Sequence, residues 1–280
     1  MGIAQFCEAL GPSERFSFAS RIVAATQSQP EPDARLEKRT HLDQGRYSVT
    51  LRDYGKGLAE VAWAFVPSVP FPKGARGESE KREANEDRAV RRARSTLRQK
   101  ILAAGTDHLL TLTYRENVTD YTRAASDLTR FIRLVRKQMP KWVYVAVAEQ
   151  QKRGAWHWHL AVRGRQDVAL LRAAWREVVG DGNIDVNPPK GPSGRRQLAL
   201  VKYLGKYLAK GFTESDREFN ARRFRSSLGI RVPGESIEIP AAVRSHVDRY
   251  VAERLKDASG QLGHIWVSPD RTSGWACSWN

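Results

Sequence analysis

Residues 142–162 read WVYVAVAEQQKRGAWHWHLAV, and this stretch decides how the surrounding chain folds. Its two ends, 142–148 and 156–162, are short apolar runs rich in Val, Trp and Tyr, which is typical of buried strands. The polar residues 151–154 between them end in glycine and favour a turn. The segment therefore predicts an antiparallel β-hairpin.

The second strand of this hairpin carries His157 and His159, separated by one residue. Alternate side chains of a strand share a face, so both imidazoles project together about 6–7 Å apart along the backbone. If the turn is centred near Arg153, the Glu149 side chain lies on the same face of the hairpin as the histidines and directly across from one of them. Two nitrogens and one carboxylate oxygen suit Mg²⁺ or Mn²⁺ as the ion used in catalysis. This ion would polarise a phosphate oxygen. Gln151 is the alternative ligand if the register differs, and ordinary strand histidines are the alternative interpretation.

Residues 202–210, KYLGKYLAK, form the second informative stretch. Tyr203 and Tyr207 are four residues apart and share a face of a helix, so both hydroxyls could reach one metal-bound phosphate. A tyrosine that attacks phosphorus forms a phosphotyrosine ester and conserves the energy of the broken bond. Lys202, Lys206 and Lys210 form a cationic stripe that could lower a tyrosine pKa or hold the phosphate. The alternative is a packing helix with solvated lysines.

The composition favours a basic globular protein with a polyanionic partner. A formal net charge of +16 over 280 residues accompanies 41% hydrophobic residues, which is enough for a core. The two cysteines, Cys7 and Cys277, have no CxxC spacing, which excludes a sulfur-ligated zinc module and favours a reducing cytoplasm. No apolar run is long enough to span a bilayer. We therefore expect a soluble protein with no membrane partner.

The order of predicted elements defines the fold class. The regular part contains strands and helices at 109–114, 121–139, 142–148, 156–162, 167–179, 183–186 and 198–210. This β-α-β-β-α-β-α order predicts an α+β, ferredoxin-like or RRM-like sandwich with a central antiparallel sheet flanked by helices. A hairpin at 46–66, a linker at 67–77 and a charged helix at 78–104 precede it, and a further helix is expected at 240–255.

These elements suggest three regions. They are an N-terminal extension with a β-hairpin (1–75), a central domain with its leading charged helix (76–212), and a basic C-terminal extension (213–280). The last region contains Arg217, Arg222, Arg223 and Arg225, for which contact with a nucleic-acid backbone is the favoured interpretation over a solvated helix.

Three motifs in this order resemble the HUH endonuclease superfamily. Within it they are similar to the rolling-circle replication initiators of filamentous and other single-stranded DNA phages and related plasmids. The motifs are LTLTY at 110–114, GAWHWHL at 154–160 and KYLGKY at 202–207. The resemblance covers about residues 105–212, and Glu149 matches the family's acidic third ligand.

The resemblance implies a metal-dependent enzyme that nicks one DNA strand at a replication origin. A tyrosine retains the 5′-phosphate, with Tyr203, Tyr207, Lys206 and Lys210 as catalytic residues and His157, His159 and Glu149 as metal ligands. The 3′-hydroxyl then serves a polymerase in the cytoplasm of a bacterial host cell. The chain lacks a GxxxxGK[ST] loop, so a host helicase is expected to unwind the duplex.

Two alternatives remain open. A single-strand transposase or relaxase shares the metal and tyrosine chemistry. A non-catalytic nucleic-acid-binding protein could use the same sandwich, stacking bases on sheet aromatics. The candidates for such stacking are Tyr114, Trp142, Tyr144, Trp156 and Trp158.

Overall fold

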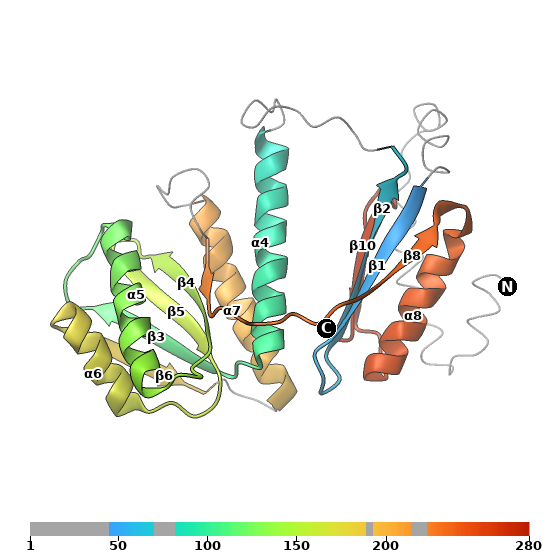
Figure 1. Cartoon of the computed structure of the whole chain (residues 1–280). Coiled ribbons are helices and arrows are strands. Elements are labelled where there is room, and N and C mark those ends of the chain that lie inside the picture. The colour runs from blue at the N-terminus through green and yellow to red at the C-terminus, as the bar shows by residue number, and fades with distance from the viewer. Residues whose placement is uncertain (1–44, 70–81, 189–192, 214–222, 280) are drawn as a thin grey trace. The chain divides into compact units, whose positions relative to one another are not determined.

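The structure, a computed structural model, describes residues 45–69, 82–188, 193–213 and 223–279. The chain divides into two compact units, which Figure 1 shows. Unit 1 combines Met1–Ala75 with Pro233–Asn280, whereas unit 2 is the continuous segment Arg76–Val232. Unit 2 is thus inserted into the sequence of unit 1.

Unit 2 contains the predicted order of strands and helices. Its elements are α4 (Arg82–Ala104), β3 (His108–Tyr114), α5 (Tyr121–Gln138), β4 (Tyr144–Gln150), β5 (Trp156–Val162), α6 (Val168–Val179), β6 (Gly182–Asn187), α7 (Ser193–Thr213) and β7 (Arg225–Ser226). The sheet order is β6-β3-β5-β4-β7, and every neighbouring pair is antiparallel. This arrangement confirms the α+β, ferredoxin-like prediction.

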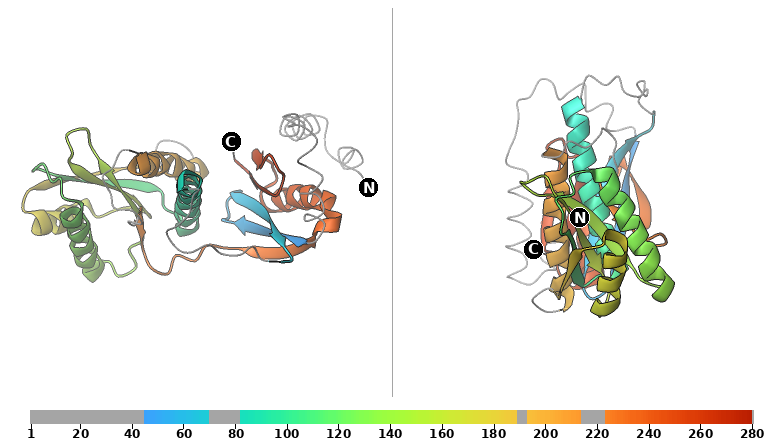
Figure 2. Two further views of the ribbon diagram at one scale, coloured as in Figure 1. Left: turned by 90° about the horizontal axis from the view of Figure 1, so that it is seen from above. Right: turned by 90° about the vertical axis from the view of Figure 1, so that its left-hand side faces the viewer.

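The two faces of this sheet are covered by different helices. Figure 2 shows α5 and α6 on one side of the sheet and α7 on the other. The first face carries an aromatic-rich core that includes Trp158, Trp175 and Phe131, all fully buried. On the second face, leucines of α4 and α7 pack on Val145 and Val147 of β4. Alternation along each strand therefore assigns neighbouring residues to separate cores.

Side-chain caps explain where α5 and α6 begin. The Asp120 carboxylate accepts hydrogen bonds from the backbone N–H groups of Thr122 and Arg123, as an N-cap residue does. Asp167 caps α6 in the same way through the N–H of Leu170. Gly180 ends α6 at φ 77°, a conformation that glycine adopts without steric cost.

The central hairpin differs from the prediction at its outer end. Strand β4 begins at Tyr144 rather than Trp142, and it continues to Gln150. The Trp142 indole N–H donates to the Gln166 side chain at 2.8 Å, so this residue anchors the loop before α6 instead of the sheet. Helix α7 is longer than the predicted 198–210 at both ends.

Unit 1 is a second antiparallel sheet with one helix packed on it. Its elements are β1 (Gly45–Asp53), β2 (Ala59–Pro67), β8 (Glu235–Pro240), a 3-10 turn η1 (Ala241–Val243), α8 (Ser245–Ser259), β9 (His264–Val267) and β10 (Ser273–Cys277). The strand order is β8-β1-β2-β10-β9. The turn between β1 and β2 has positive φ at Gly55, Lys56 and Gly57, and Tyr47, Val49 and Trp63 belong to the core beneath α8.

The C-terminal region therefore differs from the sequence prediction. The helix expected at 240–255 begins at Ser245, because Pro240 ends β8 and residues 241–243 form a 3-10 turn. The sequence reading assigned no strand to this region, yet β8 and β10 flank the β1–β2 hairpin. The predicted N- and C-terminal extensions thus contribute strands to one sheet.

Some predictions concern residues that the structure does not describe. Arg217, Arg222, Cys7 and most of the predicted linker at 67–77 lie outside the described residues. Among the described helices, none is both long and apolar enough to cross a membrane.

Candidate active site on the α7 face of unit 2

The β4–β5 hairpin places the two histidines and Glu149 on the face that α7 covers. Glu149 is directly opposite His157 in the antiparallel register. The His159 Nε2 atom and the Glu149 Oε2 atom are 2.8 Å apart and form a hydrogen bond. His157 and His159 are both buried, with 9% and 4% of their surface exposed.

The Glu149 carboxyl is held in its ionised form. Burial alone would raise its pKa, but the hydrogen bond and charge of His159 and the charge of Lys210 outweigh burial and lower the pKa. An ionised carboxylate can only accept, so Nε2 of His159 carries the proton in this arrangement. Nδ1 of the same ring lies 3.3 Å from the Thr111 hydroxyl, within hydrogen-bond distance.

Both predicted tyrosines contact the His159 ring. Tyr207 stacks on this ring with centroids 4.4 Å apart and planes at 17°. Tyr203 meets it edge-on at 5.5 Å, and the two tyrosine rings are 4.9 Å apart. The Tyr207 hydroxyl donates to the Tyr203 hydroxyl across 3.3 Å. The helical spacing of four residues thus brings two phenols and an imidazole into one cluster.

The two tyrosines differ in environment. Tyr203 is 37% exposed, whereas Tyr207 is partly buried against His159. Burial raises the pKa of Tyr207, and its hydrogen bond to Tyr203 and the nearby charge of Glu149 raise it further. Tyr207 is therefore held as a neutral hydrogen-bond donor. A phenolate at Tyr203 would accept that bond.

The three lysines of the predicted cationic stripe have different surroundings. Lys210 Nζ lies 3.6 Å from Glu149 Oε1 and donates to the Gln150 carbonyl oxygen at 3.3 Å. Lys206 Nζ lies 5.8 Å from the centre of the Tyr207 ring. Lys202 is exposed on the same helix. Lys210 thus supports Glu149, and Lys206 adds positive charge beside Tyr207.

The donor set fits a divalent ion, although the side chains are not arranged around one. In the described part of the chain, no three His, Cys, Asp or Glu side chains are gathered as metal ligands. Glu149 bonds directly to His159 instead. However, Nε2 of His157 is buried and has no hydrogen-bond partner among the residues that the structure describes. A buried imidazole nitrogen without a described partner, next to a carboxylate, has the chemistry of a metal ligand.

Burial also bears on His157 as a ligand. It lowers the pKa of His157, and the charge of His159 lowers it further. The ring is therefore kept neutral, which is the form that binds a metal. Gln151, the alternative ligand, places its amide nitrogen 3.4 Å from His157 Nδ1. Glu149 and Gln151 thus each contact one of the two histidines.

The two described arginines of the predicted DNA-contact segment bond within unit 2. Arg223 donates to the Gly211 carbonyl oxygen at 3.0 Å, and Arg225 donates to the Thr129 hydroxyl at 3.1 Å. Both side chains are half-buried. These contacts tie the end of unit 2 to α7 and α5, so Arg223 and Arg225 have a structural role here.

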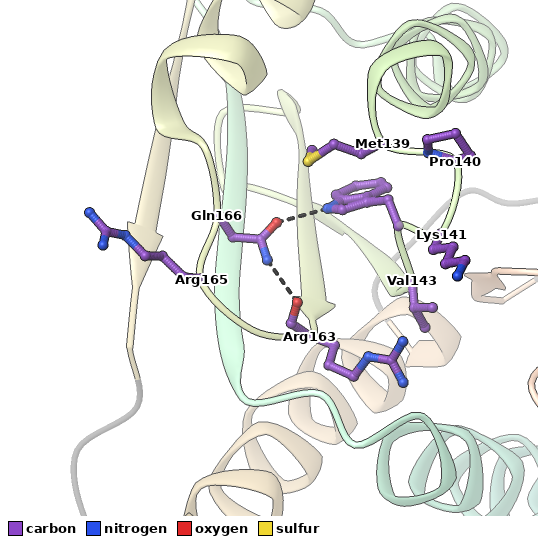
Figure 3. A pocket seen from close by; sticks show the side chains of 8 residues that line it. Met139, Pro140, Lys141, Val143, Arg163, Arg165 and Gln166 are labelled. Atoms are coloured by element: carbon purple, nitrogen blue, oxygen red, sulfur yellow. Dashed lines mark hydrogen bonds between the residues drawn. The ribbon is translucent and has the colours of Figure 1, made fainter.

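A separate pocket of about 420 Å³ lies at the outer end of the β4–β5 hairpin. Its lining includes Lys141, Arg163 and Arg165, and none of the residues that line it is acidic. Figure 3 shows the Gln166 amide between the Trp142 indole and the Arg163 carbonyl, with the Arg165 side chain directed away from Lys141. The catalytic candidates do not line this pocket, because they lie toward the hairpin turn.

The candidate site lies within a segment of the chain that matches a known protein family. Residues 107–212 match the family model described as Replication-associated protein ORF2/G2P, a family of rolling-circle replication initiators. This match confirms the resemblance inferred from the three motifs and associates the segment with replication initiation. No curated protein and no solved structure matches the chain.

Sequence reasoning missed one residue of the site, Thr111, and one contact of a predicted residue, that of Lys210 with Glu149. Thr111 contacts His159 from β3, and Lys210 contacts Glu149 from α7. Thr111 has a sequence signal, because it alternates with the buried residues Leu110 and Leu112. The pairing of Lys210 with Glu149 has none, since it depends on how α7 lies across the hairpin.

Proposed function

We propose that this chain is a site-specific endonuclease that nicks and rejoins single-stranded DNA to initiate rolling-circle replication. The observation that carries the proposal is the cluster of Tyr203, Tyr207, His159 and Glu149 inside the segment that matches the initiator family. The proposed nucleophile Tyr203, which is 37% exposed, and the proposed metal ligands lie together there.

The proposed reaction exchanges one phosphodiester for another. The Tyr203 hydroxyl loses its proton, its oxygen attacks phosphorus, and the bond from phosphorus to the 3′-oxygen breaks. The 3′-oxygen takes up one proton in exchange and leaves as a 3′-hydroxyl. The 5′-phosphate remains on tyrosine. A later 3′-hydroxyl attacks the phosphotyrosine, restores the DNA bond and returns a proton to the tyrosine oxygen. The phosphotyrosine ester conserves the free energy of the broken phosphodiester bond, so rejoining needs no ATP.

Each residue of the cluster has a distinct task in this reaction. Exposure of Tyr203 allows in-line approach of a strand, and the hydrogen bond donated by Tyr207 stabilises the Tyr203 phenolate. His157, His159 and Glu149 would hold Mg²⁺ or Mn²⁺, which would supply positive charge to the phosphate oxygens. Thr111 would orient the His159 ring, and Lys210 would orient the Glu149 carboxylate.

The alternative functions receive less support. The five aromatics considered for base stacking, Tyr114, Trp142, Tyr144, Trp156 and Trp158, are all buried in the core under α5 and α6. They cannot stack bases on an open sheet, which argues against an RRM-like binding module. A transposase or relaxase would use the same chemistry, but the matched family favours replication. A helicase and a polymerase as host partners remain part of the proposal.

The experiment is to trap the covalent adduct. Purified protein is incubated with Mn²⁺ and a single-stranded library that has a random central region and a 3′-end label, because tyrosine retains the strand downstream of the nick. We expect a labelled protein band that survives denaturation, and its DNA identifies the cleaved sequence. The Tyr203→Phe, Tyr207→Phe double variant should form none, whereas the control Tyr121→Phe, on the other face, should form it normally. Absence of any wild-type adduct would overturn the proposed chemistry.

A further inference from the structure

We propose that the exposed side chains of β6, Asn183, Asp185 and Asn187, read the bases that flank the cleaved phosphate. The inference rests on the proposed function for the identity of the ligand, single-stranded DNA. It adds a sequence-reading surface to the chemistry of the tyrosines and histidines.

The strand register puts β6 in line with the histidines. Asp185 pairs with Thr111 across the β6–β3 ladder, and Thr111 pairs with His159 across the β3–β5 ladder. Residues directly opposite each other in antiparallel strands share a face. Two strand spacings separate Asp185 from His159, which is about 10 Å. The bases concerned would thus lie within roughly three nucleotides of the cleaved phosphate, at about 3.4 Å for each stacked nucleotide.

This part of the face is open in the described structure. Asn183, Asp185 and Asn187 are all exposed, whereas the intervening Ile184 is buried in the core beneath α5 and α6. Helix α7 packs mainly against β4 and β5. The strand β6 is also the edge of the sheet. A nucleotide chain leaving the tyrosines toward β6 therefore meets the exposed polar side chains of this strand.

The chemistry of these side chains suits bases rather than phosphates. A phosphate-gripping surface needs cations, and those of the site lie on α7 at Lys202 and Lys206. An exposed carboxylate repels phosphate but accepts a hydrogen bond from the amino group of a base, and an asparagine amide both donates and accepts. We therefore expect the lysines of α7 to contact the DNA backbone and the polar side chains of β6 to contact the base edges.

The carboxylate of Asp185 is already oriented for this role. Asn187 Nδ2 donates to Asp185 Oδ2. Within the described part of the chain, Asp185 has no cationic partner. Its Oδ1 atom is therefore available to accept from a base amino group. The Thr113 hydroxyl donates to the Asn183 carbonyl oxygen at 3.0 Å, which further ties β6 to β3.

The test compares the base preferences of variants. Asp185→Asn and Asn183→Ala are incubated with the same random single-stranded library and Mn²⁺, and the strands trapped on tyrosine are sequenced. The control is Glu177→Gln, which removes one negative charge from α6 on the opposite face. Thermal melting checks that each variant remains folded.

We expect Asp185→Asn to change the preferred base at one position near the nick. The wild-type optimum should be cleaved about 10-fold less, as expected for loss of one base contact, while the variant's own optimum is cleaved normally. Glu177→Gln should keep the wild-type profile. Identical base preferences in all three variants would overturn the inference.

A second arm separates this inference from the proposed function. The library is selected by retention on immobilised protein without divalent ion, so that no cleavage is required. If wild type forms no adduct but Asp185→Asn still shifts the preference among retained strands, base reading by β6 holds and the nicking chemistry fails. If retained strands show no preference in wild type, or the same preference in both proteins, the role of β6 is wrong whatever the outcome of the cleavage assay.

Discussion

The two faces of the unit 2 sheet use adjacent residues for opposite purposes. Trp158 is fully buried in the core under α5 and α6, and its indole N–H donates to the Ala124 carbonyl oxygen. The next residue, His159, lies among Glu149, Tyr203 and Tyr207 on the other face. Two successive residues of one strand therefore belong to the core and to the candidate site, respectively. Substitutions on the two faces should have separable effects.

The largest effect is expected from removing both histidines. Replacing His157 and His159 with alanine should reduce adduct formation by about 10³-fold or more, because the phosphate loses its electrophilic stabilisation. Single-stranded DNA binding should persist, since the basic side chains remain. Quantified adduct formation and fluorescence anisotropy measure the two properties. Unchanged cleavage in this variant would refute the metal-site assignment.

A core substitution on the opposite face should show the reverse pattern. Trp175 is fully buried, packs against Tyr114 and Phe131, and donates its indole N–H to the Thr113 carbonyl oxygen. We expect Trp175→Ala to cost about 3–5 kcal/mol of unfolding free energy, measured by urea denaturation. Trp266→Ala, at a side chain that is 48% exposed, is the matched control and should cost much less. Equal losses would contradict the assignment of this core.

The two tyrosines should divide the reaction between them. We expect Tyr203→Phe to lose the first adduct, because Tyr203 is the exposed acceptor of the Tyr207 hydrogen bond. The Tyr207→Phe variant should still nick DNA, but it should fail to rejoin the strand at the origin sequence that replication regenerates. Mass spectrometry of trapped peptides identifies the modified tyrosine. If one variant loses every adduct while the other nicks and rejoins at wild-type rates, one tyrosine acts alone and alternating use is wrong.

The buried site should make stability depend on pH. The pKa of His157 is lowered from 6.5 and that of Glu149 from 4.5, so each group binds its proton more readily in the unfolded chain. Their stabilisation is present above those ordinary values and is lost as the pH falls through the folded values. The melting temperature should therefore decline below about pH 6.5 and again below about pH 4.5.

Two variants test which residue causes each decline in melting temperature. His157→Gln should remove the decline that begins near pH 6.5, and Glu149→Gln should flatten the part below pH 4.5. Glu177→Gln, on the opposite face, is the control for loss of one carboxylate. Melting curves between pH 3.5 and 8, each relative to this control, provide the measurement. A Glu149→Gln curve parallel to wild type would show that this carboxylate does not contribute.

The smallest effect is expected from single surface cations. The net charge of +16 predicts DNA binding that weakens steeply with salt. Arg91, Arg92 and Arg94 are exposed on α4. If one of them contacts a phosphate, its replacement with alanine should reduce the log–log salt slope by about 0.7 for single-stranded DNA. A titration from low to high salt gives the slope, and a flat response in wild type would argue against a phosphate-gripping surface.

The sequence alone determined most of the local structure and most of the residues that form the candidate site. Alternation places Trp158 and His159 on opposite faces, and the turn at 151–154 places Glu149 across from one histidine, which the strand register identifies as His157. Four-residue spacing places Tyr203 and Tyr207 on one face of α7. These features depend on neighbours within a few residues, where backbone periodicity fixes the direction of each side chain.

Only the tertiary structure decided the contacts between distant segments. The strands β8 and β10 join the β1–β2 hairpin although the whole of unit 2 separates them in the sequence. Lys210 approaches Glu149, and Asp185 aligns with Thr111 and His159. Strand pairing and long side chains find such partners only once helices and sheet have packed. Local propensity carries no signal for that choice, because many pairings bury similar apolar surface.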